Sequence, residues 1–169
     1  MFGIQMIFFM KTATVKELKD QLNKCSHKEL LEICLRLSKF KKENKELLSY
    51  LLFEAADEAS YIEGIKNEMD EQFELINKKN YFFIKKSIRK ILRGLRNYIR
   101  YSKKQETEAE LLIYFCVKLR ALRPSIGANL VLKNLYNRQV ESIRKKVAKL
   151  HEDLQYDFEV ELEELRLYA

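Results

Sequence analysis

The feature that most constrains the fold is a helical repeat of apolar residues that runs through most of the chain. From Thr14 to about Leu167, large apolar residues recur every three or four positions, the spacing that places them on one face of an α-helix. The chain of 169 residues has only four glycines and one proline, which are the usual turn residues. The sequence therefore predicts an all-α protein. It argues against a β-sandwich, a Rossmann fold and a glycine-rich phosphate loop.

Capping signals and polar breaks indicate where the helices begin and end. A capping box, in which Ser or Thr is followed three residues later by Glu, occurs at Thr14, Ser26 and Thr107. A proline at position 124 ends another segment. We expect about six helices, packed as long antiparallel hairpins into an elongated bundle or a short α-solenoid. Their approximate ranges are 15–22, 27–40, 45–77, 81–101, 109–122 and 125–167, of which the third and the last are long.

The predicted helix at 109–122 differs from the others because it is apolar on almost all sides. A helix with this composition is buried in the core of a protein. We therefore expect it to be the most buried element of the fold.

The length of the chain fits one domain, which we place at residues 14–169. Residues 1–13 are an apolar extension that need not belong to the folded unit, and Met10 is a better candidate start. Residues 1–9 would then be frayed or lie in an apolar groove. They are too short for a membrane span and have neither the basic region nor the cleavage site of a signal peptide.

The three cysteines are an odd number with no metal-ligand spacing, which argues against a disulfide framework and a zinc site. Cys34 and Cys116 lie within apolar runs, so we expect them to be buried, reduced thiols. This use of cysteine is typical of a reducing compartment and predicts a cytoplasmic protein.

The most distinctive feature of the sequence is the separation of charge between two consecutive helices. Residues 54–74 contain eight acids and one base, whereas residues 78–104 contain eleven bases and no acid. The turn at 77–80 makes these helices antiparallel neighbours, so their charges would flank a shared apolar seam. The eleven bases are Lys78, Lys79, Lys85, Lys86, Arg89, Lys90, Arg93, Arg96, Arg100, Lys103 and Lys104.

Three interpretations fit the basic helix. The first is pairing with the acidic helix or plain solubility, the second is binding to nucleic acid, and the third is binding to an anionic membrane or an acidic protein. In the second, Tyr81, Tyr98 and Tyr101 would stack on bases. The candidate anion-binding residues, on or near one side of the helix, are Lys85, Lys86, Arg89, Lys90, Arg93, Arg96 and Arg100.

The C-terminal helix is also divided by charge. Residues 138–149 are mainly basic, and residues 152–164 contain seven acids and no base. We expect the acidic end to cover part of the basic helix at 81–101 or to pair with a second protomer.

No constellation of residues indicates catalysis, a metal or a cofactor. His27 and His151 are isolated from other ligand types, and Cys25 is the one candidate nucleophile because it lies near His27 and a helix start. We therefore predict no catalytic, cofactor-binding or metal-binding residues, and no small-molecule substrate.

We expect a non-catalytic, helical interaction or scaffold protein that binds a protein partner or a second copy of itself. The alternative is a nucleic-acid-binding protein that uses the basic helix at 81–101. A membrane surface is the least favoured partner. The net charge of +7 does not decide between these classes, because attraction depends on exposed and clustered charge.

Overall fold

A computed structural model describes residues 12–168, and every regular element among them is a helix, so the predicted all-α fold is confirmed. This part of the chain has eight α-helices rather than about six, with a short π-helix, η1, and a short 3₁₀ helix, η2. The elements are α1 (Val15–Leu22), α2 (His27–Phe40), α3 (Lys42–Ser49), η1 (Tyr50–Glu54), α4 (Glu58–Glu74), α5 (Tyr81–Ser102), α6 (Gln105–Ala121), η2 (Ile126–Ala128), α7 (Leu130–Val147) and α8 (Glu152–Glu164).

The chain divides between Glu46 and Leu47 into two compact units, which we call unit 1 and unit 2. Residues 1–11 of the predicted N-terminal extension lie outside the described residues. The prediction of a single domain over residues 14–169 stays a prediction.

The two longest predicted helices are each broken in the structure. The predicted helix 45–77 is interrupted before Asp57, whose carboxylate accepts a hydrogen bond from the backbone N–H of Ser60 at 3.1 Å and so caps α4. The predicted helix 125–167 is interrupted after Val147, and α8 starts at Glu152 with acidic residues in its first turn. Acidic groups stabilise the start of a helix. The apolar spacing continues across both breaks, which is why periodicity alone did not reveal them.

Two of the three predicted capping boxes are confirmed. The side chains of Thr14 and Ser26 accept hydrogen bonds from the backbone N–H groups of Glu17 and Glu29, and these glutamates accept hydrogen bonds from the cap N–H groups in return. The third capping box is wrong. Helix α6 begins at Gln105, and Thr107 is buried inside the fold.

Unit 1 contains α1, α2 and the start of α3, and neither α1 nor α2 has a buried residue. The predicted apolar stripe of α2 is present, but Ile33 and Leu37 are 37% and 56% exposed. Cys34, which we expected to be buried, is exposed as well. The sequence pattern determines which face of α2 is apolar, and none of the described residues of unit 1 buries this face.

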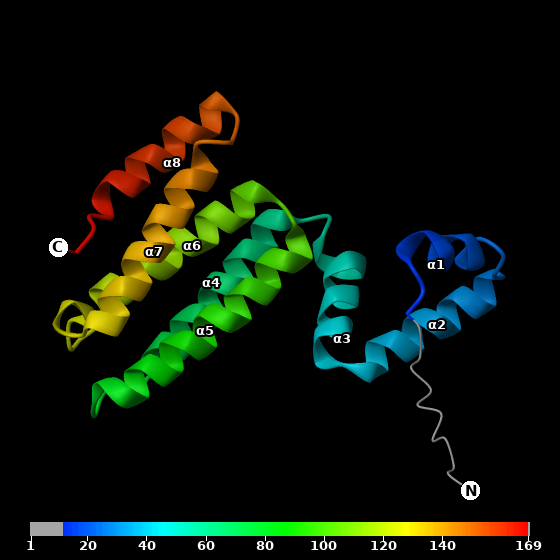
Figure 1. Cartoon of the computed structure of the whole chain (residues 1–169), viewed down its shortest axis with the longest axis horizontal. Coiled ribbons are helices and arrows are strands. Elements are labelled where there is room, and N and C mark those ends of the chain that lie inside the picture. Colours follow the sequence, from blue (N-terminus) through cyan, green and yellow to red (C-terminus); the bar gives the residue numbers. More distant parts are fainter. Residues whose placement is uncertain (1–11, 169) are drawn as a thin grey trace, which may run out of the picture. The chain divides into compact units, whose positions relative to one another are not determined.

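Unit 2 is built around α6, as its apolar composition predicts. Helices α4, α5, α7 and α8 all pack against α6, and Figure 1 shows α4 beside α5 and α8 beside α7. Eight of the residues of α6 are buried, and Phe115 and Cys116 have no exposed surface. Burial raises the pKa of the Cys116 thiol to about 12, so this cysteine is the inert, apolar residue that we expected.

The carboxylate of Glu58 joins four elements at one end of unit 2. Its oxygens accept hydrogen bonds from the hydroxyls of Ser102 at 2.5 Å, Thr107 at 2.6 Å and Tyr50 at 2.9 Å. They also form an ion pair with the Lys104 ammonium at 2.9 Å. Burial by itself raises the pKa of Glu58, but these partners outweigh it and lower the pKa to about 2.

We predict that Glu58→Gln lowers the free energy of unfolding at neutral pH by about 2 kcal/mol, because the amide cannot reproduce four bonds to a charged acceptor. The pKa is lower in the folded state, so the ionised group stabilises the fold above its unfolded pKa. This stabilisation disappears as pH falls toward 2. Urea denaturation of the two proteins between pH 7 and pH 3 should therefore show a difference that narrows toward low pH.

Glu63 is the control, because it is an exposed residue of the same helix. Glu63→Gln should change the free energy of unfolding by less than about 0.5 kcal/mol. A loss for Glu58→Gln that does not change with pH would contradict the account of Glu58.

Candidate functional site

Helix α5 turns one side to α4 and carries its exposed bases on the other. Ile91, Leu95 and Tyr98 lie where α5 meets Ile65 and Met69 of α4. Given 3.6 residues per turn, the opposite side carries a row of bases with steps of three and four residues. This row, which we call the basic stripe, consists of Lys86, Arg89, Arg93, Arg96 and Arg100, all exposed. Lys85, which is half-buried, and Lys90, which is exposed, flank the stripe.

Within residues 12–168, no carboxylate forms an ion pair with any of the seven bases of α5. Of the eleven bases within residues 78–104, Lys104 forms an ion pair with Glu58 of α4 in the described structure, and the other ten form none. Pairing with the acidic helix, which was one of the interpretations left open, therefore does not account for the bases of α5. The reason is geometric, since the basic stripe lies about one helix diameter away from α4.

The acidic and basic groups of α4 instead pair with α6. Asp70 forms an ion pair with Lys118 at 2.8 Å and accepts a hydrogen bond from the Tyr114 hydroxyl at 2.8 Å. Burial acts to raise the pKa of Asp70, but Lys118 and Tyr114 outweigh it, and the pKa is lowered. Lys66 of α4 forms a second ion pair with Glu110 of α6 at 2.7 Å. These contacts leave the bases of α5 without acidic partners.

Three arginines of the basic stripe line a groove between α5 and α7. This groove, which we call the α5–α7 groove, has a volume of about 430 Å³. The Arg96 guanidinium crosses it and donates to Gln139 Oε1 of α7 at 3.3 Å. Arg138 of α7 is held in place by a bond from its Nε to the Asn134 carbonyl at 3.2 Å. The lining residues are Arg89, Leu92, Arg93, Arg96, Leu135, Arg138 and Gln139.

The side chains of the groove are suited to binding an anion and not to acid–base catalysis. A guanidinium donates hydrogen bonds in a planar fork that matches a phosphate or a carboxylate, and it stays protonated at physiological pH. Sequence reasoning found Arg89, Arg93 and Arg96 but missed Arg138 and Gln139. The periodicity of α7 shows which residues face its own core, and it contains no information on which distant helix lies beside it.

The three tyrosines that would stack on bases in the nucleic-acid interpretation make contacts within the fold instead. Tyr101 is buried, and the Tyr98 hydroxyl donates to Glu68 of α4 at 2.7 Å. The Tyr81 hydroxyl donates to the Ser125 carbonyl at 2.8 Å. The exposed aromatic residues of α5 are Phe82 and Phe83, at 67% and 38% exposure.

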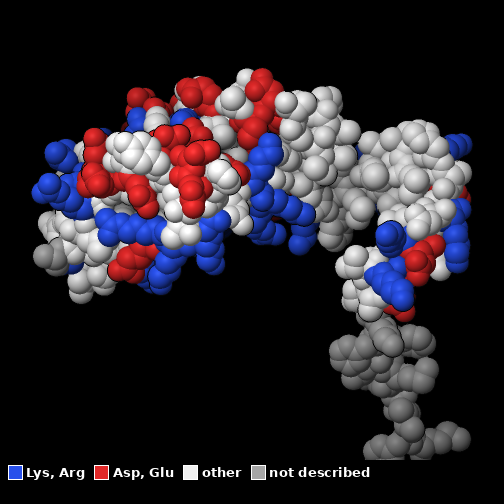
Figure 2. All heavy atoms as spheres, turned by 90° about the horizontal axis from the view of Figure 1, so that it is seen from above, with Lys and Arg blue, Asp and Glu red and all other residues white. Residues whose placement is uncertain are grey.

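The expectation that the acidic C-terminal helix covers the basic helix is also wrong. Helix α8 packs against α6 and α7, and no ion pair joins its seven acids to α5 in the described part of the chain. The alternative, pairing of α8 with a second protomer, stays a prediction. Figure 2 shows acidic side chains gathered on one part of the surface of unit 2, with basic side chains beside them.

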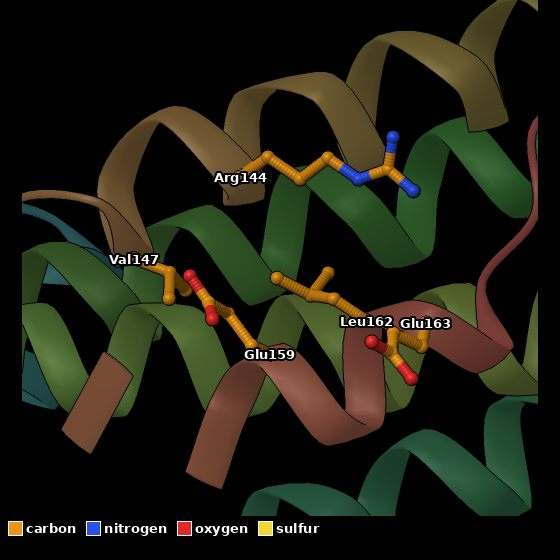
Figure 3. Close-up of a pocket in the computed structure, with 5 residues that line it drawn as sticks. All are labelled: Arg144, Val147, Glu159, Leu162 and Glu163. Atoms are coloured by element: carbon orange, nitrogen blue, oxygen red, sulfur yellow. The ribbon is translucent and has the colours of Figure 1, made fainter. Parts of the chain in front are cut away.

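A second groove, between α7 and α8, provides a comparison. It has a volume of about 360 Å³, and Figure 3 shows Arg144 and Val147 of α7 facing Glu159, Leu162 and Glu163 of α8. Here one arginine lies with two carboxylates, so the charge of the groove is not positive. The α5–α7 groove, by contrast, has four arginines and no acid in its lining.

The residues that we considered for catalysis or metal binding are not brought together. Cys25 is half-buried beside the start of α2, and His27 is exposed. His151 lies near the start of α8, with its Nδ1 atom 3.4 Å from Oδ2 of Asp153. Over residues 12–168, no three or more His, Cys, Asp or Glu side chains form a group suited to a metal ion. The helices in this range are also too short or too polar to cross a membrane.

Comparison of the chain with protein-family models, with curated proteins and with solved structures finds no match.

We predict that Arg93→Gln raises the free energy of unfolding by about 0.5 to 1 kcal/mol at low salt. Arg93 lies within three or four residues of Arg89, Lys90 and Arg96, and like charges at this spacing destabilise a helix. Gln has a similar helix propensity to Arg, so the charge is the main difference. Urea denaturation at low and high sodium chloride should show the gain at low salt and its loss at high salt.

Lys66→Gln is the matched control. It should change the free energy of unfolding in the opposite direction, because Lys66 has an acidic partner. It should lower the free energy of unfolding by about 0.2 to 1 kcal/mol at low salt. If Arg93→Gln were as destabilising as Lys66→Gln, Arg93 would have an acidic partner and the site would not be free to bind an anion.

Proposed function

We propose that the protein binds nucleic acid through the basic stripe and the α5–α7 groove. The observation that carries this proposal is the convergence of four arginines from two helices, with no carboxylate paired to them in the described structure. Unpaired like charges on one face oppose folding. An anionic ligand would offset that cost, and phosphate is the anion that suits the guanidinium best.

The dimensions of the stripe suit a polymer better than a single small anion. From Lys86 to Arg100 it extends about 21 Å along α5, at 1.5 Å per residue. Successive bases lie about one turn apart, so one strand passing along α5 would meet several of them. Each neutralised phosphate releases counterions, which supplies affinity and makes the binding depend on salt.

The distribution of charge would orient the ligand. Helices α5 and α7 contain seven and five bases with one acid between them, whereas α4 and α8 contain six and seven acids with one base. A field divided in this way draws a polyanion to one side and repels it from the other. We place this binding in the cytoplasm, because the three cysteines are free, as in a reducing compartment.

The test is fluorescence anisotropy with short DNA and RNA between about 50 and 200 mM salt. We predict that wild-type affinity falls about a hundredfold over this range, as expected for about five phosphate contacts. The variant Arg89→Glu, Arg93→Glu, Arg96→Glu should lose at least tenfold in affinity at the lowest salt. The slope of its log affinity against log salt concentration should be shallower by about two, because three phosphate contacts are lost.

The matched control is Lys16→Glu, Lys19→Glu, Lys24→Glu in unit 1, which changes the net charge equally at three exposed bases. It should keep most of the wild-type affinity. No binding of the wild type at about 50 mM salt, or an equal loss in the control, would contradict the proposal.

A second candidate function, favoured by unit 1, is interaction with a protein, and the partner we propose is a second copy of this chain. None of the described residues of unit 1 buries the apolar side chains of α1 and α2, and Leu37 and Phe40 are 56% and 77% exposed. Acids and bases are mixed along both helices in nearly equal numbers, so the charges of α1 and α2 give little repulsion between two such faces. A twofold interface uses the same face of both copies, which this arrangement allows.

We predict that sedimentation velocity shows a concentration-dependent dimer for the wild type. The variant Ile33→Ser, Leu37→Ser, Phe40→Ser should be a monomer, because it removes apolar area from α2 while keeping the charge. Since none of these side chains is buried, unit 2 should remain folded, with an unchanged melting temperature. A wild-type chain that stays monomeric at high concentration would contradict this candidate.

A further inference from the structure

We infer that the nucleic acid is single-stranded, and that one unpaired base enters the α5–α7 groove. This inference rests on the proposed function and adds the form of the strand that the site takes. It depends on three features of the site: the apolar floor of the groove, the orientation of Gln139, and an exposed ring that continues the basic stripe.

The groove has an apolar floor beneath a basic rim. Leu92 and Leu135 are 5% and 7% exposed, whereas the four arginines that line the groove are exposed. Phosphate gains nothing from an apolar floor, but the flat face of a base does. In a duplex the bases are stacked and paired, so a base reaches such a floor only if it is first unstacked, which has a cost. An unpaired base enters without that cost.

Gln139 provides a donor inside the groove. Its side chain lines the groove, and the residue is only 8% exposed. Arginine can only donate, so the atom that the Arg96 guanidinium contacts at 3.3 Å must be the amide oxygen. The amide nitrogen therefore points away from Arg96, and it has no hydrogen-bond partner in the described structure. It is placed to donate to a carbonyl or ring nitrogen on the edge of a base.

Phe82 continues the basic stripe toward the start of α5. It precedes Lys86 by four residues and Arg89 by seven, so it lies in the same row on the helix. The ring is 67% exposed and packs edge-on against Phe83, with the ring centroids 5.5 Å apart. An exposed ring beside a row of phosphate-binding side chains is the arrangement with which proteins stack the bases of a single strand.

An exposed phenylalanine beside lysines would also suit an anionic membrane. The α5–α7 groove favours the nucleic acid, because an unpartnered amide donor above an apolar floor recognises a base edge and has no counterpart in binding to a lipid surface. The membrane is therefore one outcome of the test.

The experiment uses the full chain and measures anisotropy with a single-stranded oligonucleotide and with a duplex of the same sequence. The variants are Phe82→Ala and Gln139→Leu, which leave every charge in place. We expect the wild type to bind the single strand at least tenfold more tightly than the duplex. Each variant should lose about fivefold or more for the single strand, with unchanged duplex affinity and an unchanged salt slope. Phe53→Ala, at a ring that is 75% exposed on η1, should have no effect.

Circular dichroism and the melting temperature establish that the variants fold. Because Phe82 is exposed, Phe82→Ala keeps the test decisive even if Gln139→Leu does not fold. Equal affinity of the wild type for both strand forms, or an unchanged single-strand affinity in Phe82→Ala, overturns the inference and leaves the proposed function intact. Tighter binding to phosphatidylserine vesicles than to the oligonucleotide, lost in Phe82→Ala, overturns it in favour of a membrane. The absence of salt-sensitive binding to either strand form overturns the proposed function itself.

Discussion

A helix that is apolar on almost every side can be stable only where other elements surround it, and unit 2 meets this requirement for α6. Four helices, α4, α5, α7 and α8, pack against it. This enclosure brings α5 and α7 together, although 27 residues separate them in the sequence. The groove between them follows from two helices that share one central neighbour. The candidate site is therefore a consequence of how the core is covered.

The same packing determines which charges are neutralised. Charged residues of α6 pair with Lys66 and Asp70 of α4, and Glu108 of α6 pairs with Lys146 of α7. These contacts lie along the seams around the central helix. The basic stripe points away from the seam with α4, so the bases of α5 keep their full charge. Like charges gathered on one face are expected to lower stability, and the proposed anionic ligand would supply the missing opposite charge.

Much of the fold could be predicted from the sequence, because local signals determine it. The bounds of α5, the burial of α6 and the caps at Thr14 and Ser26 each depend on residues close together in the chain. The direction of the basic stripe could also have been predicted, since Ile91 and Leu95 mark the opposite side of α5. The sequence left open whether the opposite charges of the two neighbouring helices face each other.

Contacts between distant residues could not be predicted. Arg89 of α5 and Arg138 of α7 line the same groove, because of how their two helices pack on α6. Asn137 is another case: its side chain donates to the Tyr168 carbonyl at 2.9 Å and accepts from the Tyr168 N–H at 3.0 Å, which ties the C-terminal segment to α7. A polar residue in a helix looks like a candidate break until its partner is known. Thr107 was predicted to cap a helix for a similar reason. The sequence does not show that its hydroxyl donates to the distant Glu58 carboxylate.

Amide hydrogen exchange of the full chain, with and without a single-stranded oligonucleotide, tests both the central position of α6 and the binding of a strand by α5 and α7. We expect the amides of α6 to exchange most slowly, because they open only when unit 2 unfolds. We also expect the oligonucleotide to slow exchange in α5 and α7 and to leave α4 and α8 unchanged. Exchange in α6 as fast as in the exposed helices α1 and α2, or protection by the oligonucleotide on α4 and α8, would contradict these expectations.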